Sequence, residues 1–127
     1  FLPSDGFACR FAYTRMSSKD LGTGLDLPRR PKDKLSAGLD VKPAKGLDMG
    51  LRMTVVGRRT DTDFTAWPAA VVSLPACALL DATISWTVGG GAELFLRADN
   101  ILDERYEMVY GYGSPGFGAH VGFRLTL

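Results

Sequence analysis

Alternation of apolar and polar residues with a period of two is the feature that most constrains this chain, and it recurs in six segments. The clearest case runs from Leu47 to Val55, where apolar side chains alternate with Asp48, Gly50 and Arg52. Such alternation places successive side chains on opposite faces of a strand. No stretch offers a sustained helical period, so the sequence predicts an all-β chain. The predicted strands are 6–16, 32–42, 46–59, 75–88, 92–101 and 117–127.

The links between these strands alternate between long and short along the chain. Segments 17–31, 60–74 and 102–116 are long, whereas 43–46 and 89–91 are tight turns that contain Pro or Gly. Because consecutive strands of an antiparallel meander reverse direction, all three long links should emerge at one end of the sheet. Short turns at one end and longer loops at the other are typical of outer-membrane β-barrels.

The two faces of the predicted sheet differ in charge. The apolar face carries no charged residue in any strand, whereas the opposite face combines Arg and Asp with glycines such as Gly38, Gly50 and Gly118. Several strands reach about the 9–11 residues that a tilted membrane strand needs, and globular strands usually stop at about five or six. The pattern favours an antiparallel up-and-down meander in a transmembrane barrel. A soluble barrel that binds a lipid or another ligand is an alternative, because alternation alone fits both.

Six strands are too few to enclose a lumen, because single-chain bacterial barrels begin at about eight. An unpaired strand edge is not tolerated in hydrocarbon, since each bare N–H or C=O group costs several kcal/mol. We therefore expect outer-membrane lipid on the apolar face. The remaining barrel strands should come from further sequence, another chain or self-association. The chain opens at Phe1 without an initiating Met, as expected of a mature chain or a piece of one.

Charge and composition argue against several other functions. Lys and Arg number 15 and Asp and Glu 14, and the formal net charge of +1 argues against a nucleic-acid partner. One histidine, His120, and two distant cysteines, Cys9 and Cys77, predict no metal site. Segment 111–116 has the glycine spacing of a dinucleotide loop, but it precedes a strand and contains Pro115. We expect no enzyme activity, no catalytic residue and no cofactor.

The last third of the chain carries the most specific motif. Segment 97–107 reads RADNILDERYE, and YGY follows at 110–112 and PG at 115–116. This order resembles the end of TonB-dependent outer-membrane receptors, where an Asn-Leu-Phe-Asp-x-x-Tyr segment follows the penultimate strand. Among these receptors it most resembles the cobalamin (vitamin B12) transporter group. Upstream, LPRRPKDK at 27–34 resembles the Pro-Arg-x-Pro-x-His-Lys entry to an earlier strand, with Asp33 where His is frequent.

The resemblance implies the C-terminal portion of a barrel of about 22 strands with a plugged lumen. Nothing in the sequence resembles the plug domain, so we expect a barrel segment over residues 1–127, with TonB reached only through further sequence. The implied function is uptake of a scarce, bulky nutrient, a corrinoid or a metal chelate, at the outer membrane of a Gram-negative bacterium. The alternative is a shortened relative that completes or braces a larger barrel or complex without transport.

The same reasoning yields three sets of candidate site residues. Ion pairs of mixed sign should join the polar face to the plug, through Arg10, Arg52, Asp81, Arg97, Asp99, His120 and Arg124. Ligand contacts should come from the long links, where aromatic and hydrogen-bonding groups suit a bulky polar ligand: Arg58, Asp61, Asp63, Trp67, Tyr110 and Tyr112. The last strand resembles the terminal signal read by the barrel-assembly machinery, through His120, Gly122, Leu125 and Leu127, although an aromatic residue usually closes that signal.

Overall fold

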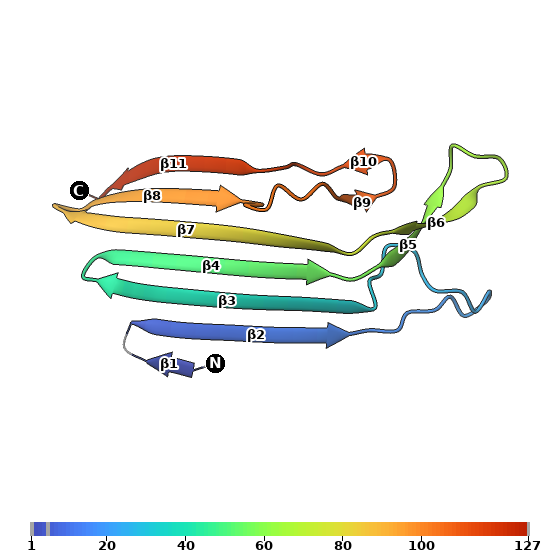
Figure 1. The fold of residues 1–127 in the computed structure, drawn as a ribbon, viewed down its shortest axis with the longest axis horizontal. Helices are drawn as coiled ribbons and strands as arrows, with labels where there is room; N and C mark the ends of the chain where they lie inside the picture. Colours follow the sequence, from blue (N-terminus) through green and yellow to red (C-terminus); the bar gives the residue numbers. More distant parts are fainter. Residues whose placement is uncertain (1, 5, 127) are drawn as a thin grey trace.

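The computed structural model describes residues 2–4 and 6–126, which form strands, turns and loops. Seven antiparallel strands build the main sheet in the order β1-β2-β3-β4-β7-β8-β11 (Figure 1). Their bounds are Leu2–Ser4 for β1, Phe7–Arg15 for β2, Asp33–Ala44 for β3, Leu47–Val56 for β4, Cys77–Gly89 for β7, Ala92–Asp99 for β8 and Gly118–Leu125 for β11. Among the described residues no helix is long and apolar enough to cross a membrane. The predicted all-β meander of long strands is confirmed.

The strand register keeps like side chains together across the main sheet. Met49 of β4 pairs with Ile84 of β7, and the neighbouring Gly50 pairs with Thr83. Because side chains alternate along each strand, one register fixes the composition of both faces. Apolar residues therefore gather on one face, and charged residues, polar residues and glycines gather on the other.

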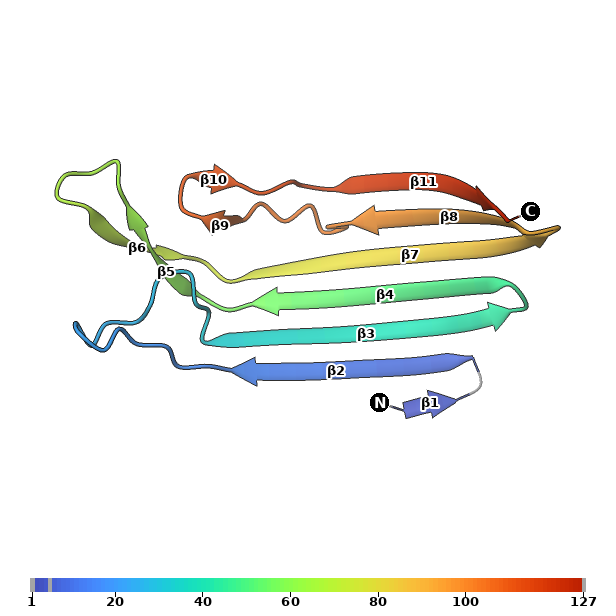
Figure 2. The same cartoon turned by 180° about the vertical axis from the view of Figure 1, so that it is seen from behind.

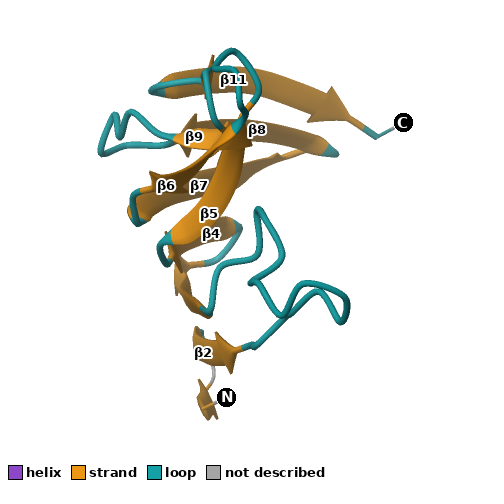
Figure 3. Ribbon diagram, turned by 90° about the vertical axis from the view of Figure 1, so that its right-hand side faces the viewer, coloured by secondary structure: helices purple, strands orange, loops and turns teal. Residues whose placement is uncertain are grey.

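The main sheet is a single twisted layer (Figure 3). Large side chains on its apolar face remain accessible: Phe11 is 71% exposed and Phe123 is 73% exposed. Buried apolar residues are confined to Val56, Leu74 and Cys77 among the described positions, where β4 ends, β6 ends and β7 begins. Soluble monomers rarely expose a continuous apolar surface of this kind, so the face requires hydrocarbon or another apolar cover.

All three long links lie at one end of the main sheet, and the short turns lie at the other end (Figures 1 and 2). Two of the long links contain small hairpins. The second link forms β5 (Arg59–Asp63) and β6 (Ala70–Leu74), and the third forms β9 (Glu107–Val109) and β10 (Tyr112–Gly113). The sequence did not predict these hairpins, because their strands are short and lack apolar alternation.

The segment expected to form one strand over 46–59 is divided in the structure. β4 ends at Val56, and the Gly57 N–H donates to the Asp33 carbonyl at 2.8 Å. The chain then leaves the main sheet and begins β5 at Arg59. This break directs the next residues over the end of the sheet, where the other long links meet them.

Candidate functional site

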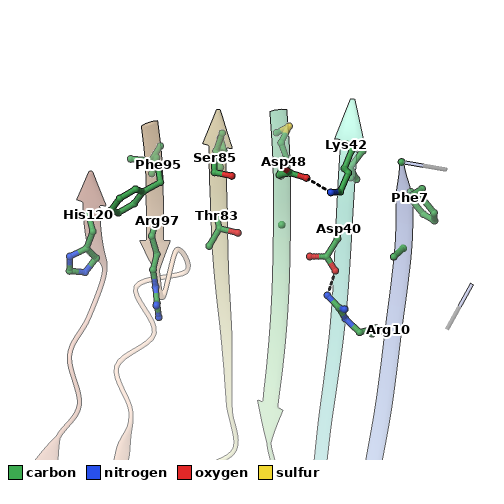
Figure 4. A pocket seen from close by; sticks show the side chains of 17 residues that line it. Phe7, Arg10, Asp40, Lys42, Asp48, Thr83, Ser85, Phe95, Arg97 and His120 are labelled. Carbon is green, nitrogen blue, oxygen red and sulfur yellow. Dashed lines mark hydrogen bonds and ion pairs between the residues drawn. The ribbon is translucent and has the colours of Figure 1, made fainter. Parts of the chain in front are cut away.

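Charged and small side chains cover one face of the main sheet, which we call the charged wall. Together with larger apolar residues, including Phe7 and Phe95, they line a recess of about 580 Å³ across neighbouring strands (Figure 4). Arg10 comes from β2, Asp40 from β3, Arg97 from β8 and His120 from β11. Position 50 in this recess requires glycine, since a Cβ there would lie only 2.7 Å from the hydroxyl oxygen of Thr83.

Ion pairs organise the charged wall. The pairs are Arg10 with Asp40, Lys42 with Asp48, Arg97 with Asp99, and Arg124 with Glu93, and the His120 imidazole also faces Asp99. The separation is 2.7 Å between Arg97 Nε and Asp99 Oδ1, and 3.5 Å between His120 Nε2 and Asp99 Oδ2. Exposed pairs of this kind contribute only about 0–1 kcal/mol each. Their main effect is to fix the pattern of charge on the wall.

Arg52 departs from this pattern. In register it lies between Gly38 and Asp81, yet it forms no ion pair within residues 2–4 and 6–126. Asp81 instead accepts a backbone N–H just beyond β8, at 2.9 Å. Arg10, Arg52 and Arg97 line a smaller recess of about 130 Å³. The guanidinium of Arg52 therefore has N–H donors available for a partner opposite the charged wall.

A buried carboxylate joins the three long links at the other candidate site, which we call the loop end. Asp61 is 1% exposed and accepts the backbone N–H of Tyr110 at 2.8 Å. Its other oxygen accepts the N–H of Thr62 at 2.8 Å and Nε of Arg29 at 2.9 Å. Burial alone would raise the pKa of Asp61, but these hydrogen bonds and the Arg29 charge outweigh burial and lower that pKa. Asp61 is therefore ionised at neutral pH.

Arg59 lies two residues before Asp61, on the same face of β5, and is 4% exposed. Its guanidinium donates to the Glu107 carbonyl and lies 3.4 Å from the Met108 sulfur. Arg59 Nε is buried without a hydrogen-bond partner among the described residues. Arg59 and Asp61 thus hold the third link at both ends of β9, through the Glu107 carbonyl and the Tyr110 N–H.

Asn100 shapes the beginning of the third link. Its backbone has a φ of 49°, a left-handed conformation that Asn tolerates better than most residues. The side-chain amide donates to the carbonyls of Glu104 at 3.0 Å and Pro115 at 3.3 Å, and its oxygen accepts the Glu104 N–H at 3.0 Å. The Asn of the sequence motif therefore closes the two ends of this link on each other.

A pocket of about 660 Å³ opens between β6 and the third link. Two aromatic side chains, Tyr106 and Tyr110, line it together with the charged residues Asp103, Arg105 and Glu107. Its volume lies within the range of about 300–1,000 Å³ that small-molecule sites occupy. Among the features of the loop end, this pocket has the chemistry best suited to a bulky polar ligand.

The structure separates the six predicted ligand contacts into two groups. Five have exposed or half-buried side chains: Arg58, Asp63, Trp67, Tyr110 and Tyr112. The sixth, Asp61, is buried below them, with both oxygens engaged in hydrogen bonds. Asp63 also has a local role, because it accepts the N–H and hydroxyl of Thr65 at 2.8 and 2.6 Å.

The residues of the terminal signal lie on β11, apart from Leu127, which is outside the described residues. His120 is on the charged wall, and Gly122 lies under the ring of Phe95. A Cβ at Gly122 would lie 2.3 Å from Cζ of Phe95. Glycine at this position therefore makes room for an aromatic ring from the neighbouring strand.

Sequence analysis missed several residues of the loop end: Arg29, Arg59, Arg105 and Tyr106. Arg29 has a φ of 62°, and its N–H donates to the Thr60 carbonyl at 2.7 Å. A weak signal was present at 59–63, where charged residues alternate with Thr. Because this segment was interpreted as a polar loop, the alternation did not reveal that Arg59 and Asp61 are both buried.

Comparisons with known proteins agree with the fold and the motifs. No family model matches the chain. Over 66 residues, 52% of the chain, the sequence is 33% identical to the vitamin B12 transporter BtuB of Vibrio cholerae serotype O1, and the match covers 11% of that protein. The chain thus spans a small fraction of the length of the relatives that it matches.

Solved receptor structures share the fold. P. aeruginosa FpvA, bound to a pyoverdine and iron, matches 94% of the chain and 17% of its own length, with a TM-score of 0.81 and 15% identity. The siderophore receptor PirA from Acinetobacter baumannii matches 93% of the chain and 19% of its own length, with a TM-score of 0.75 and 16% identity.

A membrane-type meander with one apolar face, a charged wall and long links at one end defines a segment of an outer-membrane β-barrel. The segment resembles the barrels of TonB-dependent receptors of the Gram-negative outer membrane, and in sequence it is similar to the vitamin B12 transporter group. The resemblance inferred from the motifs is confirmed.

Proposed function

We propose that this chain is the C-terminal barrel segment of a receptor that takes up a scarce, bulky nutrient, a corrinoid or a metal chelate. The observation that carries the proposal is an aromatic, charged pocket between the second and third long links at one end of a membrane-type sheet, where Arg29 of the first link also binds Asp61. The names of similar proteins, a vitamin B12 transporter and siderophore receptors, support this nutrient class.

In this proposal the long links face outward and supply the ligand contacts. Tyr110 lines the pocket, and Arg58, Asp63, Trp67 and Tyr112 are further contacts outside it. The buried Asp61 supports the site by accepting the Tyr110 N–H. Aromatic side chains offer flat apolar surface and the charged groups offer hydrogen bonds, which suits a large polar ligand. The short turns 43–46 and 89–91 at the opposite end carry no aromatic side chain.

The charged wall faces the lumen and a plug domain, which further sequence or another chain provides. Mixed charges on the wall favour complementary pairing with a plug surface, and Arg52 is the wall residue that most needs such a partner. Outer-membrane lipid and the remaining barrel strands cover the apolar face and the sheet edges. The barrel-assembly machinery reads the last strand, and TonB acts only through further sequence.

Cysteine labelling on intact cells tests the orientation of the full-length protein. We expect Asp63→Cys, in the β5–β6 hairpin, to react with an impermeant thiol reagent, and Gly90→Cys, in a short turn, to remain unlabelled. The unsubstituted protein controls for Cys9 and Cys77, which are half-buried and buried. Labelling of Gly90→Cys without labelling of Asp63→Cys would reverse the orientation and remove the outward-facing site.

Ligand binding tests the nutrient class. Outer-membrane vesicles that contain the full-length protein should bind labelled cyanocobalamin or a ferric catecholate chelate. Tyr110→Ala should weaken binding at least tenfold, whereas Lys45→Ala, in a short turn, should not. An outer-membrane protein that binds neither probe would support the alternative, a relative that braces a larger barrel without transport.

A further inference from the structure

β5 carries two buried charges that do not bind each other. Arg59 and Asp61 are 4% and 1% exposed, and each directs hydrogen bonds to the backbone of the third link. We propose that these two residues form a clamp that positions the β9–β10 hairpin, and with it Tyr110. Arg29 attaches the first link to the same clamp, so the ligand site is preformed. This inference rests on the proposed function, which places ligand contacts on these links.

The β9–β10 hairpin needs such external support. Its strands have three and two residues, and an isolated hairpin is at best marginally stable in water. Internal bonds run from the Gly111 N–H to the Glu107 carboxylate and from the Ser114 N–H to the Tyr106 carbonyl, both at 2.9 Å. These bonds close the hairpin on itself but do not fix its place above the sheet.

The clamp supplies that placement from opposite ends of β9. Arg59 donates to the carbonyl of Glu107, the first residue of β9, and Asp61 accepts from the N–H of Tyr110, the residue after β9. A donor side chain and an acceptor side chain thus bind complementary backbone groups. The pair specifies where β9 lies along β5, because a shifted hairpin would break both bonds and leave one oxygen of the buried Asp61 carboxylate without a donor, which is costly.

Arg29 connects the clamp to the outer surface. Its backbone donates to the Thr60 carbonyl at 2.7 Å and its side chain binds Asp61 while remaining 47% exposed. A φ of 62° is uncommon for a residue with a side chain and is retained only where neighbouring contacts require it. Asp61 therefore ties the first link to the third, although they are far apart in sequence.

Amide hydrogen exchange of the full-length protein in outer-membrane vesicles tests the clamp. Asp61→Asn keeps the shape of the side chain but replaces one acceptor oxygen with a donor. We expect exchange of the Tyr110 amide and of segment 105–114 to accelerate at least tenfold. Asp20→Asn is the matched control, since Asp20 also accepts two backbone N–H groups at 2.8 Å, those of Gly22 and Thr23, but only within its own link. Equal exchange of segment 105–114 in the two variants would overturn the clamp.

A second pair of variants covers failure of Asp61→Asn to fold. Arg59→Met retains the apolar stem and should accelerate exchange around Glu107 at least tenfold, while Arg29→Gln should accelerate exchange of the Arg29 amide at least threefold. The barrel should keep its folded mobility on unheated gels in both variants. Wild-type exchange rates at both positions would refute the clamp.

Binding distinguishes positioning from a merely structural role. If the clamp prepares the site, Arg59→Met should raise the dissociation constant of whichever probe the wild type binds, cyanocobalamin or the ferric catecholate, without unfolding the barrel, because fewer molecules hold Tyr110 in place. An unchanged dissociation constant despite accelerated exchange would overturn the positioning role. The exchange measurements use no ligand, so a wild type that binds neither probe would refute the nutrient proposal while the clamp itself stays under test.

Discussion

Leu51→Arg should be among the most costly substitutions in the sheet, because it places a charge on the apolar face halfway along β4. Leu51 pairs with Leu39 on one side and Ala82 on the other, and its side chain is 42% exposed toward the space that lipid should fill. A lipid-facing Arg near the bilayer midplane costs roughly 2–4 kcal/mol in a membrane barrel. Because about 1.4 kcal/mol corresponds to a tenfold change, the folding equilibrium should shift about 30- to 700-fold.

Two neighbouring substitutions control for depth and for face. Leu47→Arg lies on the same face at the short-turn end of β4, where the cost should fall to about 0–1 kcal/mol. Arg52→Leu, on the opposite face, should mainly disturb pairing with the plug and change stability by less than about 1 kcal/mol, since an exposed ion pair contributes only about 0–1 kcal/mol. Urea titration of the full-length protein in lipid vesicles, followed by Trp fluorescence, measures all three. Equal costs for Leu51→Arg and Arg52→Leu would refute the assignment of the faces.

Three further outcomes follow from the structure. Asn100→Ala should destabilise the third link by roughly 2–4 kcal/mol, because it removes three hydrogen bonds and leaves alanine in a left-handed conformation; exchange of segment 101–117 measures this. Gly122→Ala should lower the folded yield in membranes by displacing the Phe95 ring, and Phe95→Ala should rescue it. The lowered pKa of Asp61 implies that loop protection present at pH 7 persists to about pH 4, near the unfolded value, and falls as pH drops through the folded pKa; Asp61→Asn should abolish this dependence.

The main sheet could be predicted from the sequence because a single rule governs it. A strand between lipid and a polar lumen must alternate apolar and polar side chains. Its neighbours must pair with it so that apolar side chains lie on the same face of the sheet. The pairings of Met49 with Ile84 and of Gly50 with Thr83 obey that rule. The short turns contain glycine, which marks them in the sequence, so the order of the strands could also be predicted.

The loop end could not be predicted in the same way. Its contacts join residues from three different links, such as Arg29, Asp61 and Tyr110, and no local pattern specifies which loops will meet. The sequence favoured Asp61 as a ligand contact because hydrogen-bonding side chains in a long link suit a bulky polar ligand. Burial of that carboxylate depends on a backbone N–H from a residue 49 positions away, which only the folded chain brings into place.

The position of the family motif in the fold determines what similarity across this motif indicates. Asn100 binds the backbone of Glu104 and Pro115, and a carboxylate oxygen of Asp103 accepts the N–H of Phe117 at 2.9 Å. These motif residues close the base of the third link, whichever ligand binds above it. Similarity across this segment is therefore evidence for the barrel architecture. Nutrient specificity should reside beyond the closed base, in the β5–β6 hairpin and at Tyr110 and Tyr112, and exchanging these elements between related receptors should transfer specificity while the barrel remains folded.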